Sequence, residues 1–260
     1  MAIVTLTSDL GNKDPYVAIL KAGILHTDSN VTIVDISNEV LPFDISQGAY
    51  FLKSSYHYFP KGTIHLAAVD AGNSFGNCIA LRYNDHFFIG PDNGILSLVT
   101  EARSDEIVLL PKAVVQSTFA ARDIFVKACV QLLKGKRLSD IGSPLQQMNT
   151  KIPLTPPANS NFIIAGVIHI DRFGNIILNV TRSQFDSIVQ GREVSISYTR
   201  KDVFENISNN YSDVKLGERL ILFNSAGHLE IAVNKGNAQL LLGIQMDARI
   251  QIEIKLLHVL

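Results

Sequence analysis

A carboxylate ends an apolar segment in the first third of the chain. The segment is Ile64–Val69, and Asp70 follows it directly, before a glycine-containing loop. A side chain at the end of a buried strand is held firmly, while the loop beyond it leaves room for a substrate. No lysine, arginine or histidine lies between Asp70 and Arg82. Asp70 is therefore a candidate functional acid that has no cation close to it in the sequence.

Two further polar clusters occur in the first half of the chain. The stretch TSDLGNKDPY contains Asp9 and Asp14, which could face a ligand that carries hydroxyls or an ammonium group. A helix N-cap followed by a turn is the simpler interpretation of this spacing. In PFD, Phe43 could stack on a ligand, but a core or hydrophobic-staple role is also open.

Three later clusters are equally ambiguous when each is taken alone. IDRFGN, which runs from Ile170 to Asn175, could carry a binding site or form a hairpin turn with a satisfied aspartate. NSAGHLEIAVNKGNA could be a β-hairpin followed by a helix cap. In STFAARDIF, the pair Arg122-Asp123 could be a capped helix start.

The elements that must hold these clusters alternate between strand and helix in the first half. Apolar runs predict strands at Ile3–Thr7, Val31–Ile36, Ile64–Val69, Ile79–Tyr83, His86–Ile89 and Glu106–Leu110. Helical spacing or capping predicts helices at Tyr16–Leu25, Gln47–Tyr58 after an Asp44 N-cap, Ile95–Ala102 and Asp123–Leu133. Asn84-Asp85 predicts a hairpin turn. The alternation predicts an α/β domain with a mainly parallel sheet.

The second half follows a proline-containing stretch and reads mostly as strands. We expect a linker at 141–160, between an α/β domain at 1–140 and a β domain at 161–260. Strands are predicted at Phe162–Ile170, Asn175–Val180, Val194–Tyr198, Arg219–Phe223, His228–Val233 and Arg249–Ile254. Short strands at this spacing favour a smaller all-β, barrel-like domain.

Composition limits the partners of the chain. It has 260 residues, 47% of them hydrophobic and 18% charged, and a net charge of −1. This balance is typical of a folded protein without the basic surface that nucleic acid or anionic membrane would attract. We expect a small-molecule partner, no nucleic acid and no membrane span. MAIVTLTSDLG favours a first strand over a signal peptide, and the two cysteines suit a reduced cytoplasm.

Several common catalytic motifs are absent. The sequence has no G-x-x-x-x-G-K-[ST], no G-x-G-x-x-G and no G-x-S-x-G. Its seven histidines form no H-x-x-x-H pair, so we expect no metal site. No bound cofactor is expected.

Taken together and in order, the clusters resemble the S-adenosylmethionine (SAM) hydroxide adenosyltransferase family, the SAM hydrolases related to the fluorinating and chlorinating SAM enzymes. The resemblance covers Ile3 to about Ile254. It is carried by TSDLGNKDPYV, DISNEVLPFDISQGAYFL, YFPKGTIHLAAVD, GPDNGILSLV, STF..RDIF, IDRFGN and LEIAVNKGNA. It implies an N-terminal α/β domain, a C-terminal β-barrel, and a homotrimer whose active sites lie at subunit interfaces.

The resemblance also implies roles for matched residues. Asp9 would bind the ribose hydroxyls and Phe43 would stack on the sugar. Asp14 and Asp171 would bind the methionine ammonium, and Ser225 its carboxylate. The adenine edge would be bound by Asn175 and the backbone at Val233–Lys235. The adenine face would lie against Phe173 and Tyr211. Carboxylates suit a cation with vicinal hydroxyls, and aromatic faces suit adenine and a sulfonium.

The chain departs from the family where water would be activated. Hydrolase members resemble V-D-P-G-V-G-T-x-R and T-F-H-G-R-D, whereas this sequence reads VDAGNSFGN and TFAARD. Asp70 is kept, Ala71 replaces proline, Asn77 stands at the arginine position and Ala120 at the histidine position. Asp70 and Asn77 are the catalytic candidates, with Asn73 or Ser74 as further groups that could orient the water.

Two functions follow from this departure. Attack of water on C5′ of SAM expels neutral methionine, so Asp70 alone could sustain a slow hydrolase; general-base help is worth about 10²–10⁴-fold. The alternative is a catalytically inactive protein that binds SAM or adenosine. Ala120 and Ala121 would give a halide a dry wall, but an ionised Asp70 about 4 Å away would cost about 4 kcal/mol at an effective dielectric constant of 20. Halogenation is therefore disfavoured.

Overall fold

The computed structural model describes residues 2–72, 76–112, 118–153, 155–199, 202–204, 206–246 and 248–255. The chain divides into two compact units, Met1–Pro153 and Leu154–Leu260. Each unit has its own buried apolar core.

The first unit contains a seven-stranded sheet in the order β2-β1-β3-β5-β4-β6-β7. Its strands are β1 (Ile3–Ser8), β2 (Thr32–Ser37), β3 (Ile64–Ala68), β4 (Cys78–Tyr83), β5 (His86–Pro91), β6 (Glu106–Leu109) and β7 (Ser143–Pro144). β2, β1, β3 and β5 are parallel, and β4, β6 and β7 continue the sheet antiparallel. The predicted α/β fold class is confirmed, with a mixed sheet.

The antiparallel part begins at the predicted hairpin between β4 and β5. Asn84 and Asp85 both have positive φ, 51° and 63°. Two successive left-handed residues are typical of the two-residue turn whose twist matches that of the flanking strands. The turn therefore follows from local sequence.

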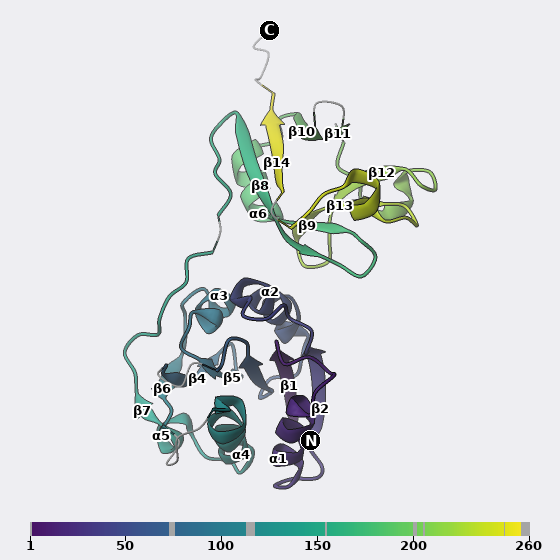
Figure 1. Ribbon diagram of the computed structural model, residues 1–260. Helices are drawn as coiled ribbons and strands as arrows, with labels where there is room; N and C mark the ends of the chain where they lie inside the picture. Colours follow the sequence, from purple (N-terminus) through teal and green to yellow (C-terminus); the bar gives the residue numbers. More distant parts are fainter. Residues whose placement is uncertain are drawn as a thin grey trace. The chain divides into compact units, whose positions relative to one another are not determined.

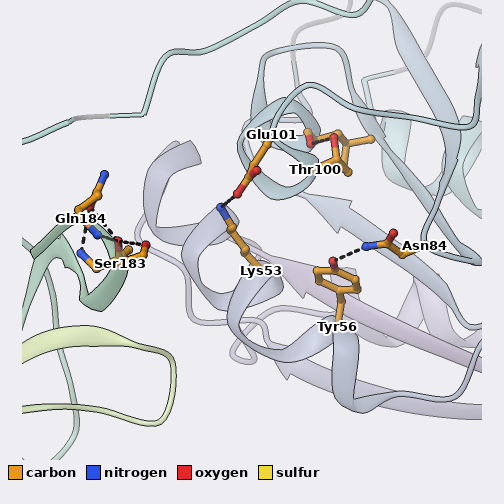
Figure 2. Close-up of polar contacts among 9 residues, drawn as sticks. Lys53, Tyr56, Asn84, Thr100, Glu101, Ser183 and Gln184 are labelled. Carbon is orange, nitrogen blue, oxygen red and sulfur yellow. Dashed lines mark hydrogen bonds and ion pairs between the residues drawn. The ribbon is translucent and has the colours of Figure 1, made fainter. Parts of the chain in front are cut away.

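Helices cover both faces of this sheet (Figure 1). They are α1 (Tyr16–Leu25), α2 (Ile45–Ser55), α3 (Ile95–Thr100), α4 (Val126–Leu133) and α5 (Leu138–Ile141), with short η1 (Tyr56–Tyr58) and η2 (Ala121–Phe125). α1 and α4 share one buried cluster with the sheet, and α2 and α3 share the other. Figure 2 shows two polar contacts near α2 and α3. Lys53 of α2 forms an ion pair with Glu101 at 3.1 Å, and the Asn84 side chain donates to the Tyr56 hydroxyl at 3.3 Å.

The strand that ends at Asp70 is buried throughout. Every residue of β3 is buried, as expected of a central parallel strand covered on both faces. β1 lies beside it in parallel, so Ser8 pairs with Ala68. The carboxyl ends of β1 and β3, and hence Asp9 and Asp70, come to the same edge of the sheet.

The second unit is a nearly closed antiparallel barrel-like sheet in the order β11-β10-β14-β8-β9-β13-β12. Its strands are β8 (Phe162–Ile170), β9 (Ile176–Thr181), β10 (Val194–Thr199), β11 (Asp202–Phe204), β12 (Arg219–Phe223), β13 (His228–Val233) and β14 (Arg249–Ile254). The buried and exposed residues of β14 alternate, which places one face on the core. The predicted all-β domain is confirmed.

In the described part of the second unit, short helices accompany the sheet: α6 (Arg182–Val189), η3 (Tyr211–Asp213) and α7 (Ala238–Leu242). α6 was not among the predicted elements. It opens with a capping box, in which Thr181 and Gln184 bond reciprocally; Figure 2 includes Ser183 and Gln184 of this turn. Across the described ranges, no helix combines the length and apolarity needed to cross a membrane.

Candidate functional site

Asp9 joins three segments of the first unit. Its Oδ2 accepts the backbone N–H of Phe43 at 2.9 Å and that of Asp70 at 3.0 Å. These partners lie 34 and 61 residues away in the sequence. Within the part of the chain that the structure describes, Oδ1 has no hydrogen-bond partner. Three predicted site residues therefore come together at the carboxyl end of the parallel strands, with one carboxylate oxygen available to a ligand.

Both residues held by Asp9 have left-handed backbone. The φ angle is 67° at Phe43 and 50° at Asp70, a conformation that costs about 1–2 kcal/mol for a residue with a side chain. Hydrogen bonds from each N–H to the same carboxylate offset part of that cost. The clamp formed by Asp9, Phe43 and Asp70, called the Asp9 clamp below, thus fixes two strained turns at once.

The clamp presents Phe43 to solvent. Its side chain is 73% exposed, so a core or staple role for Phe43 is wrong. The turn is fastened on its other side by α2, because Asp44 caps the helix by accepting from the N–H of Gln47 at 3.0 Å. Gln47 in turn accepts from the N–H of Leu41 at 2.7 Å. An exposed aromatic ring on a doubly fastened turn can serve as a stacking face.

Asp14 lies outside the clamp. It is exposed, and across the described residues it has no hydrogen-bond partner. The N-cap of α1 is Pro15, without a side-chain cap bond, so the helix-cap interpretation of Asp14 is wrong. Its carboxylate is free to bind a cation.

The positions near Asp70 carry little polar chemistry. Asn77 is exposed and lies just before β4. Its backbone carbonyl accepts from the N–H of Asp92 at 2.8 Å, and its side chain has no bond partner among the described residues. Ala120 is partly buried and Ala121 is buried. Asn73 and Ser74 lie outside the described residues. Asp70, which is partly buried, is therefore the acidic group that this region offers to a water molecule.

The pair Arg122-Asp123 belongs to the helix start rather than to this acid. Arg122 donates two hydrogen bonds to the Asp123 carboxylate, both at 2.8 Å. It also lies 5.7 Å from the centre of the Phe119 ring. The guanidinium is thus engaged within its own turn.

In the second unit, Asp171 organises a tight local turn. Its Oδ1 accepts from the N–H of Phe173 and of Asn175, both at 2.9 Å, and its Oδ2 accepts from the Asn175 side chain at 3.0 Å. The satisfied-aspartate turn predicted for IDRFGN is present. Gly174 has φ of 80°, and a Cβ there would lie 2.2 Å from Asn237. The turn projects the Phe173 ring, which is 73% exposed.

The predicted hairpin and helix cap of NSAGHLEIAVNKGNA are also present. β12 pairs with β13, and Asn237 caps α7 by accepting from the N–H of Leu240 at 2.8 Å. Val233 is buried, and its carbonyl accepts from the N–H of Gly236 at 3.1 Å. Lys235 has left-handed backbone, φ 52°. The start of α7 lies beside the Gly174 turn, since the N–H of Gln239 donates to the Gly174 carbonyl at 2.9 Å.

Sequence reasoning assigned no role to a buried acid in this unit. Glu230 of β13 is 3% exposed and accepts from the Tyr211 hydroxyl at 2.8 Å and from the Asn224 amide at 3.1 Å. Burial raises the pKa of the Glu230 carboxyl, and the negative charge of Asp171 raises this pKa as well. The two hydrogen bonds lower the same pKa in part. The signal was a lone acid within the apolar run LEIAV. Ser225 lies in the turn that follows Asn224.

Three further titratable groups of the first unit are buried or partly buried: Cys78, Cys129 and Asp92. Both cysteines are buried, and burial raises the pKa of Cys78 to about 11 and that of Cys129 to about 12. Burial also raises the pKa of Asp92, which accepts from the N–H of Asn149 at 2.7 Å. Among the described residues, no three histidines, cysteines or acids gather as a set of metal ligands.

Two family models match the chain. The SAM hydroxide adenosyltransferase N-terminal domain matches residues 4–142, and the SAM hydroxide adenosyltransferase C-terminal domain matches residues 165–251. The resemblance predicted from the ordered motifs is confirmed.

Individual relatives agree with these matches. A Methanocaldococcus jannaschii protein named (R)-S-adenosyl-L-methionine hydrolase is 31% identical over 96% of this chain and 95% of its own length. A protein named fluorinase, from Actinopolyspora mzabensis, is 25% identical over 89% of this chain and 90% of its own. The crystal structure of an uncharacterized conserved protein from Thermotoga maritima has a TM-score of 0.84 and 31% identity, covering 96% of this chain and 99% of that one.

Proposed function

The chain belongs to the SAM hydroxide adenosyltransferase family, and on that premise we propose that it hydrolyses SAM to adenosine and methionine. A water oxygen forms a bond to C5′ of the ribose as the bond from C5′ to sulfur breaks. The electron pair of that bond goes to the sulfonium sulfur, so methionine leaves as a neutral thioether without a general acid. The water loses one proton to a base.

Asp70 is the base in this proposal, and the Asp9 clamp is the observation that carries it. One carboxylate oxygen of Asp9 holds both the backbone of Phe43, whose ring is exposed, and the backbone of Asp70. The second oxygen would accept from a ribose hydroxyl, while Phe43 packs on the sugar. Ribose bound in this way would bring C5′ toward the acid at the end of β3, because Asp70 and the ribose would share one anchoring residue. Fixing a water and C5′ in line supplies much of the rate that a missing cation would otherwise add.

The second unit would bind the two ends of the substrate. Asp171, with Asp14 of the first unit, would attract the methionine ammonium, and Ser225 would bond the methionine carboxylate. The adenine would be bound by Asn175, the backbone at Val233–Lys235, and the rings of Phe173 and Tyr211. The exposure of Phe173 and the free carboxylate of Asp14 support these assignments.

We further propose that the ligand-binding residues of the two units meet between subunits of a homotrimer in the cytoplasm. Candidate residues divide between the units, from Asp9 to Asn77 in the first and from Asp171 to Lys235 in the second. Light scattering of the purified protein measures the subunit number. A monomer that still hydrolyses SAM would contradict the shared site.

A second candidate function is SAM or adenosine binding without turnover. It is favoured by one observation: Ala120 is small and the Asn77 side chain has no bond partner among the described residues, whereas the hydrolase pattern has histidine and arginine at these positions. Loss of those groups removes contacts that would orient the water. The binding assignments above are the same in both functions, and only hydrolysis requires Asp70.

The deciding experiment is incubation of the purified protein with SAM, followed by chromatography for adenosine and methionine. The two sulfonium epimers are supplied separately, since the M. jannaschii relative is named for the (R) form. We expect equimolar adenosine and methionine, and no 5′-chloro-5′-deoxyadenosine when chloride is added. Stoichiometric binding of SAM with no product would establish the binding function instead.

A further inference from the structure

Glu230 is a carboxylate buried on the outer face of the barrel-like sheet. Its neighbours along β13, Leu229 and Ile231, pack into the barrel core, so Glu230 points to the other side. Ala232 shares that side and packs with Leu220, Leu222 and the half-buried Val214. The segment that contains η3 covers this side, because its Tyr211 hydroxyl bonds Glu230 and Val214 packs on the apolar residues there. Glu230 therefore lies between the sheet and the segment that carries Tyr211.

The two oxygens of Glu230 hold two different ligand-binding segments. Oε1 accepts from the hydroxyl of Tyr211, and Oε2 accepts from the side-chain amide of Asn224. The Asn224 amide cannot turn over, because its own oxygen already accepts from the N–H of Ala226 at 3.0 Å and of His228 at 3.1 Å. The donor side of Asn224 thus requires an acceptor at the position of Glu230.

Stability alone does not account for a carboxylate at this position. Across the described chain, no lysine, arginine or histidine forms an ion pair with Glu230, and the charged group that acts on it is another acid, Asp171. An acid buried without a cation costs several kcal/mol, and apolar side chains of similar size often serve the fold as well or better. The apolar neighbours Leu222 and Ala232 show what this face accepts.

We propose that Glu230 is a positioning residue for the substrate of the function proposed above, on which this inference rests. Through Tyr211 it fixes the ring that stacks on adenine; that ring is 44% exposed while its hydroxyl is tied to the sheet. Through Asn224 it fixes the turn that presents Ser225 to the methionine carboxylate. One buried acid thereby sets the spacing between the two ends of the ligand-binding surface of this unit.

The experiment measures separate dissociation constants for adenosine and methionine by calorimetry, together with the melting temperature, for Glu230→Met, Glu230→Gln and Tyr211→Phe. The Glu230→Met substitution keeps the length of the side chain and removes both hydrogen-bond acceptors. Glutamine keeps both contacts, since its oxygen can accept from Asn224 while its amide donates to the tyrosine oxygen. Glu218→Gln is the matched control, because Glu218 accepts from the N–H of Lys215 in an exposed turn of the same unit.

We expect Glu230→Met to melt at or above the wild-type temperature while binding adenosine and methionine about tenfold more weakly. Glu230→Gln should restore both affinities to within about threefold of the wild type. Tyr211→Phe should weaken adenosine alone, and Glu218→Gln should change neither. A purely structural role predicts instead that affinity and melting temperature fall together.

Unchanged affinities in a folded Glu230→Met would overturn the proposal. If that variant does not fold, Tyr211→Phe decides, and wild-type affinity for adenosine there would overturn the proposal equally. Failure of the wild-type protein to bind either ligand would refute the proposed function itself, and the role of Glu230 with it. These two failures are distinguishable because one appears in the wild type and the other only in variants.

Discussion

Two aspartates, one in each unit, hold backbone N–H groups in the same way but over different spans. Asp9 binds partners 34 and 61 residues away, whereas Asp171 binds partners two and four residues away. The Asp171 turn can form as soon as its own six-residue motif closes. The Asp9 clamp can form only after β1 and β3 have paired, so it depends on the long-range structure of the first unit. The hydrogen bonds of Asp171 therefore depend on residues close in the sequence, whereas those of Asp9 depend on the fold of the first unit.

The largest effect is expected from Asp9→Ala. The substitution removes the acceptor for two N–H groups and leaves the left-handed turns at Phe43 and Asp70 unsupported. We expect a loss of about 2–4 kcal/mol in the free energy of unfolding of the first unit, and no measurable adenosine production. Hydrogen exchange followed by mass spectrometry reports the stability of each unit separately.

Asp35→Ala is the control for that variant, because it removes an exposed acid of β2 whose partner is Lys21. Exposed pairs of this kind contribute about 0–1 kcal/mol. A first unit as stable in Asp9→Ala as in Asp35→Ala would show that the clamp does not support the fold.

A smaller effect is expected from Asp171→Ala. The N–H groups of Phe173 and Asn175 lose their acceptor; water can replace it at the exposed Phe173 but less readily at the buried Asn175. We expect the second unit to lose about 1–2 kcal/mol, the first unit to be unchanged, and methionine affinity to fall. A loss as large as that of Asp9→Ala would remove the distinction between the local and the long-range clamp.

His65 in the first unit and Glu230 in the second should contribute to stability with opposite dependence on pH. Burial lowers the pKa of His65 from 6.5 to about 3, so between these values the unfolded histidine is protonated and the folded one is not. Its contribution to stability is present above pH 6.5 and is lost as the pH falls toward 3. Burial also lowers the pKa of His86, 3.1 Å from His65. The raised pKa of Glu230 has the opposite effect. Its contribution to stability is present below the ordinary glutamate pKa of 4.5 and is lost as the pH rises.

Hydrogen exchange at pH 7 and pH 5 tests this difference, with His65→Gln as the matched variant. We expect acidification to weaken the strand that carries His65 more than the strand that carries Glu230, by less than about 2 kcal/mol. His65→Gln should flatten the pH dependence of the first unit. An equal loss in the two strands, or the same pH dependence of stability in His65→Gln as in the wild type, would contradict the assignment.

The division between local and long-range structure also decides what the sequence predicts. The strand and helix pattern, the Asn84-Asp85 turn, the Asp44 cap and the Asp171 turn could all be predicted, because each depends on neighbours in sequence. The α6 helix was missed although its capping box, Thr181 to Gln184, is local and legible. The convergence of Asp9, Phe43 and Asp70, and the bonds of Glu230, could not be predicted from spacing, because strand pairing creates them.

Hydrolysis of SAM as proposed requires Asp70 as the base, and Asp70→Asn removes that base while keeping the size of the side chain. Asp85→Asn is the matched control, since Asp85 is also a left-handed aspartate in the first unit, φ 63°, but lies in the β4–β5 turn. The measurement is adenosine released from saturating SAM, with SAM affinity determined on the same samples. We predict that Asp70→Asn lowers adenosine release about 10²-fold or more while SAM affinity stays within a few-fold, and that Asp85→Asn matches the wild type. Equal adenosine release from Asp70→Asn and Asp85→Asn would show that Asp70 is not the base.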